Sequence, residues 1–223
     1  MNKIAVYAGT RNVYHRMVVA AKSLLAHNKM NKVYFLIEDD EFDEPLPEVI
    51  QCVNVSDQPY FNPDGQNFNS KWTYISMMRL ALPLMFPEEQ RMLWLDIDTL
   101  VVDDISELFE TDFEGCYVAA VAEPERCKKP FVYFNAGVLL EDLEKLRDGK
   151  CLELIDYINK NKMDFPDQDV VNILCQGRIK RLSSIYNCSI CTEEPYDRKI
   201  LHFAAEREYN RRFIWMRYEK KEW

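Results

Sequence analysis

The sequence lacks long apolar runs, has few glycines, and carries no excess of basic residues. No window approaches the ~18 continuous apolar residues that can cross a bilayer, so no transmembrane segment is predicted. Six glycines and ten prolines among 223 residues exclude long flexible linkers. The formal net charge of -9 opposes tight binding to nucleic acid, because phosphate contacts need clustered lysine and arginine. A small phosphorylated ligand remains compatible with this charge.

A secretory leader is also not apparent. The first residues, MNKIAVYAG, are typical of a strand and lack both a longer apolar core and a small-residue cleavage site. The seven scattered cysteines are therefore expected to be reduced thiols, and the location is expected to be cytoplasmic. Cys188 and Cys191 form one CxxC pair, but a zinc site needs two further ligands, so two incidental thiols are favoured.

Short strand-like segments alternate with longer helix-like segments along the chain. Strands are predicted over residues 3–8, 32–37, 49–55, 91–95, 117–122, 133–140, 179–182 and 200–203. Helical segments are predicted over residues 13–28, 72–86, 104–109, 151–161 and 167–175, with a break near Pro83. Residues 58–69 are expected to form a long polar loop. This alternation predicts an α/β fold with a parallel or mixed sheet flanked by helices, in one domain over residues 1–223.

Ligands of such sheets bind beyond the carboxyl ends of the strands, and two aspartates occupy one such end. Asp96 and Asp98 follow the apolar strand 91–95 in the run LWLDIDTLV. In extended backbone the side chains at i and i+2 point to the same side. Two close carboxylates repel unless they are protonated or bridged by a cation, and Mg²⁺ or Mn²⁺ suits oxygen ligands. The alternative is an ordinary acidic turn after a strand.

Three further segments place polar residues in apolar surroundings. In YFNAGVLL, residues 133–140, Asn135 and Gly137 interrupt a strand, which indicates either a close approach by a ligand or a bulge. In FPDQDVVN, residues 165–172, Asp167 is either a helix-capping residue or, with Gln168, part of a sugar pocket. His202 follows a short apolar strand, as a core histidine or as a third metal ligand.

Together these segments resemble the family 8 glycosyltransferases, which are retaining enzymes with a GT-A fold that use nucleotide sugars. The resemblance runs from about residue 6 to residue 203. The motifs that carry it, in the family's order, are VYA at 6–8 with Asn12 and AAKS at 20–23, the Asp96–Asp98 pair, FNAGVLL at 134–140, and DQD at 167–169. It implies a Rossmann-like mixed central sheet of GT-A type. Residues 1–100 would form a nucleotide-binding half ending in Asp-x-Asp, 101–205 a sugar and acceptor half, and 206–223 a basic aromatic tail.

The resemblance also implies a role for each matching residue. Metal ligands for Mn²⁺ or Mg²⁺ would be Asp96, Asp98 and His202. Residues toward the nucleotide sugar, most simply a UDP-sugar, would be Ala8, Thr10, Asn12, Arg79, Asp96, Ile97, Asn135, Ala136, Asp167, Gln168 and Arg207. The nucleoside would lie at Ala8, Thr10 and Asn12. The catalytic group would be Gln168, Asp167 and Arg79. Retention would come from front-face attack or from a covalent intermediate, and Gln168 is assigned a positioning role because an amide is a poor nucleophile.

The chain departs from the family pattern at both ends of the nucleotide site. Thr10 stands where family members often have an acid, and Val13 where they often have an aromatic, so stacking on uracil would need Tyr14 or Tyr7. After the histidine, Ala205 and Glu208 replace a usual Gly and Lys, which leaves Arg207 as the nearest cation for the diphosphate.

These departures keep other interpretations open. One is a degenerate, non-catalytic module that binds nucleotide sugars, and another is a DNA-modifying glycosyltransferase, which the acidic charge disfavours. A sugar nucleotidyltransferase would need a longer glycine-rich loop after the first strand.

The basic aromatic tail, 211–218, either packs on its own domain or contacts an acceptor or an anionic membrane. Homodimerisation is compatible with the sequence, and the acceptor is not readable from it.

Overall fold

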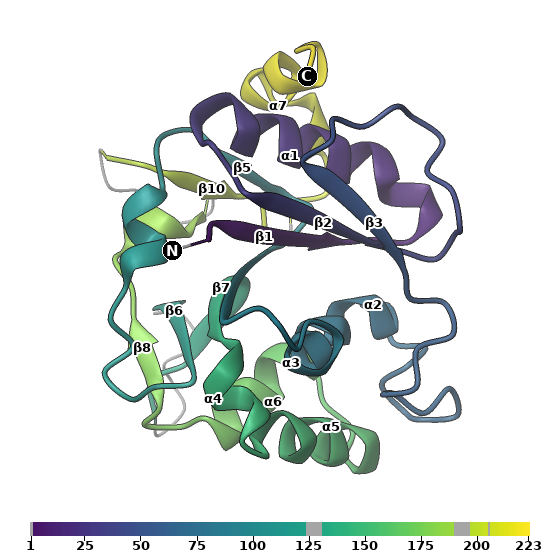
Figure 1. Ribbon diagram of the computed structural model, residues 1–223, viewed down its shortest axis with the longest axis vertical. Helices are drawn as coiled ribbons and strands as arrows, with labels where there is room; N and C mark the ends of the chain where they lie inside the picture. Colours follow the sequence, from purple (N-terminus) through teal and green to yellow (C-terminus); the bar gives the residue numbers. More distant parts are fainter. Residues whose placement is uncertain (1, 124–130, 190–196, 205) are drawn as a thin grey trace. The chain divides into compact units, whose positions relative to one another are not determined.

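The computed structural model describes residues 2–123, 131–189, 197–204 and 206–223 (Figure 1). These residues form two compact units. Unit 1 comprises Met1–Ser56, Leu93–Thr111 and Ser183–Trp223, and unit 2 comprises Asp57–Met92 and Asp112–Leu182. Each unit therefore takes segments from both halves of the sequence. Cys191 of the CxxC pair and Ala205 lie outside the described residues.

Unit 1 is built on parallel strands. β1 (Ile4–Ala8), β2 (Lys32–Ile37), β3 (Ile50–Asn54) and the end of β4 (Arg91–Leu95) lie in the order β3-β2-β1-β4, and all their pairings are parallel. Every residue of β1 is buried, as expected for a parallel strand that is covered on both faces. The helix after β1 is α1 (Tyr14–His27), which follows a short 3-10 helix, Arg11–Val13.

A second, smaller sheet in unit 1 packs against α1. β5 (Thr99–Val101) pairs antiparallel with β10 (Ile200–His202), which pairs parallel with β9 (Cys188–Ser189). The tail forms a 3-10 helix, Tyr209–Arg211, and α7 (Phe213–Glu219), which lies beside α1 in Figure 1. A shared apolar cluster joins these elements: Val19, Leu100, Cys188, Leu201, Phe203, Tyr209, Trp215 and Tyr218. The tail thus packs on its own unit.

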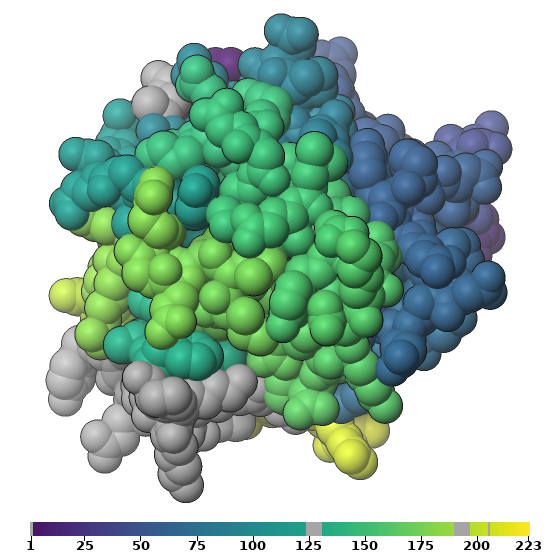
Figure 2. All heavy atoms as spheres, turned by 90° about the horizontal axis from the view of Figure 1, so that it is seen from below, coloured from purple at the N-terminus to yellow at the C-terminus, as the bar shows by residue number. Residues whose placement is uncertain are grey.

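Unit 2 combines a mixed set of strands with short helices. β6 (Val118–Ala122) pairs antiparallel with β7 (Phe134–Asp142) and parallel with β8 (Ile179–Arg181). The helices are α2 (Thr73–Met77), α3 (Leu82–Met85), α4 (Leu143–Arg147), α5 (Lys150–Lys160) and α6 (Pro166–Leu174). The segment before α2, blue in Figure 2, lies against α5, green, where the Asn67 amide donates to the Ile158 carbonyl at 2.6 Å.

The predicted α/β class with a mixed sheet is confirmed. The predicted helix over residues 72–86 is instead two α-helices joined by a 3-10 helix, Met78–Ala81, and Pro83 lies in the first turn of the second. The sequence did not predict β5, β9 or α4, which span only two to five residues and show no periodicity of their own. Within the described part of the chain, no helix is long and apolar enough to cross a membrane.

Candidate functional site

The carboxylate of Asp96 is oriented from the protein core. Trp94 and Asp96 are two residues apart at the end of β4. In extended backbone their side chains therefore lie on the same side. The indole Nε1 of Trp94, which is 2% exposed, donates to Asp96 Oδ1 at 2.8 Å. The Thr99 hydroxyl closes the turn by donating to the Asp96 carbonyl at 2.7 Å. The second carboxylate oxygen, Oδ2, faces His202.

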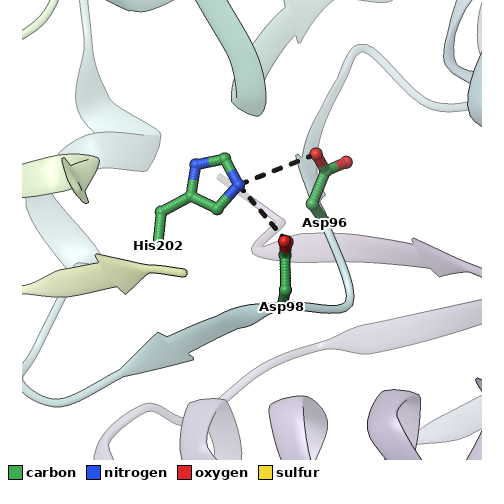
Figure 3. A group of neighbouring side chains, drawn as sticks. All are labelled: Asp96, Asp98 and His202. Atoms are coloured by element: carbon green, nitrogen blue, oxygen red, sulfur yellow. Dashed lines mark ion pairs between the residues drawn. The ribbon is translucent and has the colours of Figure 1, made fainter. Parts of the chain in front are cut away.

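β10 brings His202 to the two aspartates. Its antiparallel register pairs His202 with Thr99, and the Phe203 amide donates to the Asp98 carbonyl at 3.0 Å. His202 Nε2 lies 3.3 Å from Asp98 Oδ1 and 3.9 Å from Asp96 Oδ2 (Figure 3). One ligand atom from each of the three residues lies within 4.8 Å of the others. The three residues predicted as metal ligands are therefore brought together within unit 1.

Asn187 fixes the orientation of the His202 ring. Asn187 Oδ1 lies 2.8 Å from His202 Nδ1, and because an amide oxygen only accepts, Nδ1 carries the proton. In the neutral ring, Nε2 is then the nitrogen available to ligate a cation beside the carboxylates, which is the arrangement that ligating histidines adopt. Two carboxylate oxygens and one imidazole nitrogen fit Mn²⁺ or Mg²⁺, and the nitrogen favours Mn²⁺ because Mg²⁺ prefers oxygen ligands alone.

The turn after β1 lies at the same sheet edge as the aspartates. Val6 pairs with Trp94 in the parallel register, so Ala8 and Asp96 both lie two residues further on. A Cβ added to Gly9 would lie 2.8 Å from Met17 Sδ, so this turn lies close against α1. The Thr10 hydroxyl donates to the Asn12 side chain. The predicted nucleoside residues thus lie together with the metal ligands in unit 1.

Two tyrosines near this turn cannot stack on a base. Tyr7 is 0% exposed and its ring contacts Phe35 edge-on. Tyr14 is 5% exposed and stacks on Phe42 at a centroid distance of 5.0 Å. The Tyr14 hydroxyl donates to Asp39 Oδ2 at 2.7 Å, and burial together with this bond raises the pKa of Tyr14. Neither ring is therefore available to replace the aromatic residue that the family often has at the position of Val13.

A buried arginine organises the predicted sugar-binding residues of unit 2. Arg79 Nε lies 3.0 Å from Asp167 Oδ2, and the side chains are only 3% and 10% exposed. Arg79 Nη1 also donates to the carbonyl of Ala136. A buried ion pair needs such additional hydrogen bonds to offset the loss of hydration. Arg79 therefore ties β7 to the first turn of α6.

Gln168 completes this cluster through its amide. Its Oε1 accepts from the Ala136 amide at 2.9 Å. Its Nε2 donates to Glu123 Oε2 and to the Tyr133 hydroxyl, both at 3.3 Å. Asn135 Nδ2 donates to the same Glu123 oxygen at 3.4 Å. The four residues predicted to contact the transferred sugar, and Arg79, predicted to reach the donor's phosphate or sugar, are therefore brought together within unit 2.

Some predicted residues stand apart, and others were missed. Arg207 is exposed, and Glu208 forms a surface ion pair with Arg211 at 3.1 Å. Ile97 lies partly buried between the two aspartates. The sequence did not predict the contacts of four residues: Trp94, Glu123, Tyr133 and Asn187. Strand alternation could have indicated Trp94, two residues before Asp96. Asn187 lies 15 residues before His202 and gives no local signal.

Comparison with known proteins gives a consistent assignment. Residues 4–207 match the model of glycosyl transferase family 8. A putative glycosyltransferase of Haemophilus influenzae is 28% identical over 197 residues, 78% of this chain and 58% of the relative. Glycosyltransferase GlyE of Streptococcus pneumoniae is 29% identical over 203 residues, 84% of this chain and 48% of the relative. The chain thus spans about half the length of these relatives.

Solved structures share the fold. The GlyE structure from Streptococcus pneumoniae covers 100% of this chain with a TM-score of 0.73 and 23% identity, and 61% of that chain is covered. The galactosyltransferase LgtC, solved with donor and acceptor sugar analogues, has a TM-score of 0.73 at 22% identity, with 96% of this chain and 93% of that chain covered. The family model matches most of the described chain and both of its clusters, and the chain belongs to glycosyl transferase family 8.

Proposed function

We propose that the chain transfers a hexose or a similar sugar from a UDP-sugar to an acceptor, with metal dependence and with retention of configuration. The observation that carries this proposal is the group of Asp96, Asp98 and His202, whose ligand atoms lie within 4.8 Å of one another. Asp96 and Asp98 follow the carboxyl end of a parallel strand, and α/β folds bind nucleotides at such strand ends. Membership of the family supports the reaction class.

The unit 1 residues serve the nucleotide end of the donor. Asp96, Asp98 and His202 hold the cation, while Trp94 and Asn187 orient two of these ligands. A bound Mn²⁺ or Mg²⁺ supplies Lewis-acid stabilisation of the departing nucleoside diphosphate. Ala8, Thr10 and Asn12 line the nucleoside site, and Ile97 lies between the aspartates. These assignments rest on the shared edge of β1 and β4.

The unit 2 residues serve the sugar. Asp167 offers acceptor oxygens and is held in place by Arg79. Gln168 offers an amide and is held in place by Ala136 and Glu123. Gln168 positions the sugar, because its oxygen already accepts from a backbone amide and an amide is a weak nucleophile. Arg79 acts through Asp167, since its guanidinium is buried. Asn135 and Ala136 contact the sugar from β7.

A thermal-shift screen tests the proposal. UDP, GDP, CDP and ADP are added separately, each with Mn²⁺ and with EDTA. A ligand at about 100 times its Kd stabilises by ~2.7 kcal/mol, which raises Tm by roughly 5–10 °C for a chain of this size. We expect this shift for UDP with Mn²⁺ and a much smaller one with EDTA. A shift with another base alone would correct the donor. No shift with any nucleotide would refute the assignment.

The remaining proposals concern partners. The tail exposes Phe213, which is 85% exposed, and Met216 beside basic residues, so peripheral contact with an anionic membrane is proposed. Sedimentation with anionic vesicles, compared between wild type and Phe213→Ala, tests it. A DNA substrate would instead give strongly salt-dependent DNA binding. A single domain, a cytoplasmic location and homodimerisation remain predictions.

A further inference from the structure

Arg16 is a cation in unit 1 whose contacts do not satisfy its hydrogen-bonding capacity. It lies in the first turn of α1, with its guanidinium carbon 5.0 Å from the centre of the Tyr209 ring. Its Nε is buried and has no hydrogen-bond partner among the described residues. A buried donor without an acceptor is costly. The contacts with Tyr209 leave the Nε of Arg16 without an acceptor.

Tyr209 connects Arg16 to the metal-ligand strand. The Tyr209 ring lies 5.6 Å from Phe203, the residue after His202, and 4.8 Å from Trp215 of α7. The Tyr209 hydroxyl is also buried, on the side of Arg16. Burial raises the pKa of Tyr209, while the charge of Arg16 and a hydrogen bond with Arg16 lower it, and the charge of Asp98 raises it. Tyr209 therefore senses both Arg16 and one of the proposed metal ligands.

The charges of this region change when the site is loaded. Asp96 and Asp98 carry two negative charges, which a divalent cation neutralises. The buried Nε of Arg16 still lacks an acceptor among the described residues. A diphosphate on the cation brings more negative charge than the cation has left to offset. Guanidinium groups bind phosphate oxygens through paired N–H donors.

We propose that Arg16 binds a phosphate of the nucleoside diphosphate at the Asp96–Asp98–His202 group, with Tyr209 holding its guanidinium in place. This inference rests on the proposed function and adds a residue to it. It also makes Arg16, rather than the exposed Arg207, the principal cation for the diphosphate. Arg16 supports departure of the diphosphate by neutralising charge on its phosphate.

Inorganic pyrophosphate is the probe that isolates this contact, because it has no base and no sugar. Calorimetric titrations are run with Mn²⁺ at equal, saturating concentration in cell and syringe. Loss of one charge-assisted contact weakens binding roughly 10- to 100-fold. We expect that loss for Arg16→Met, a smaller loss for Arg16→Lys, which keeps the charge, and wild-type affinity for the matched variant Arg217→Met, which removes an exposed arginine of α7. Mn²⁺ affinity without pyrophosphate should be unchanged in Arg16→Met.

Two results would overturn the inference. One is wild-type pyrophosphate affinity in Arg16→Met. The other is an equal loss of Mn²⁺ affinity, which would mean that Arg16 only supports the fold around the ligands. The proposed function fails separately, if the wild-type chain consumes no nucleotide sugar. Arg16-dependent binding of pyrophosphate by an inactive chain would support the anion site and refute only the transfer reaction.

Discussion

Replacing Asn187 by alanine removes the hydrogen bond that fixes the His202 ring while leaving all three proposed metal ligands in place. The bond from His202 Nδ1 to Asn187 Oδ1 is 2.8 Å long, and the ring is 4% exposed. Without the acceptor, the other tautomer becomes accessible, in which Nε2 carries the proton and cannot ligate. Loss of such a supporting contact typically reduces metal affinity 10- to 100-fold. This corresponds to about 1.4–2.8 kcal/mol.

The cost to the fold is expected to be smaller than the cost to metal binding. Asn187 is partly buried, and one hydrogen bond between neutral groups contributes ~1 kcal/mol. For a chain of this size that lowers Tm by roughly 2–4 °C. Mn²⁺ affinity is measured by calorimetry, and Tm is measured in EDTA. The two readouts separate a ligand-orienting role from a structural one.

Asn187→Asp is the matched control. The carboxylate has nearly the same shape, still accepts from Nδ1, and adds a negative charge that strengthens the basicity of Nε2. Mn²⁺ binding by Asn187→Asp should therefore equal or exceed that of wild type. Unchanged Mn²⁺ affinity in Asn187→Ala would refute the orienting role. An equal loss in both variants would show that the amide group, and not an acceptor oxygen, is what matters.

Other predictions test the two units separately. Asp98→Asn should abolish transfer with Tm nearly unchanged, because the partly exposed Asp98 carboxylate faces His202 and not the core; an active variant in a transfer assay would refute the metal assignment. Thr10→Ala should weaken UDP binding more than it slows the transfer step, and an unchanged Kd by calorimetry would displace the nucleoside site. Burial raises the pKa of Glu141, which is 2% exposed, so its contribution to stability is present at low pH and is lost as pH rises through that pKa. Glu141→Gln should raise Tm at pH 8.5 relative to wild type and change it little at pH 5; a parallel pH dependence of both proteins would contradict this.

The strands and the metal ligands were predictable because their signals are local. β4 and Asp96–Asp98 occupy one stretch of eight residues in which alternation decides both burial and direction. The family resemblance inferred from ordered motifs is confirmed by the match over residues 4–207. The α/β class follows from the regular exchange between short and long apolar segments. The division into two units was not predicted, because each is assembled from separated segments.

Contacts between residues far apart in the sequence could not be predicted from local patterns. The bond from Gln168 to Glu123 joins positions 45 residues apart, and Arg16 meets Tyr209 across most of the chain. Asn187 has no pattern that distinguishes it from an ordinary loop asparagine. Whether Tyr7 or Tyr14 could stack on a base was also left open by the sequence, because it depends on contacts with distant residues. Strand burial and the stacked Phe42 direct both rings elsewhere.

The residues that define the family motif differ from those that set the affinity for the cation and the diphosphate. Asp96, Asp98 and His202 lie at strand ends, where backbone pairing alone brings them together. Their orientation depends on Trp94 and Asn187, and their charge balance, on our proposal, depends on Arg16. A sequence can therefore keep the complete ligand motif and still bind its cation or diphosphate weakly. Loss of function in Asn187→Ala or Arg16→Met, with every motif residue intact, would demonstrate this dependence directly.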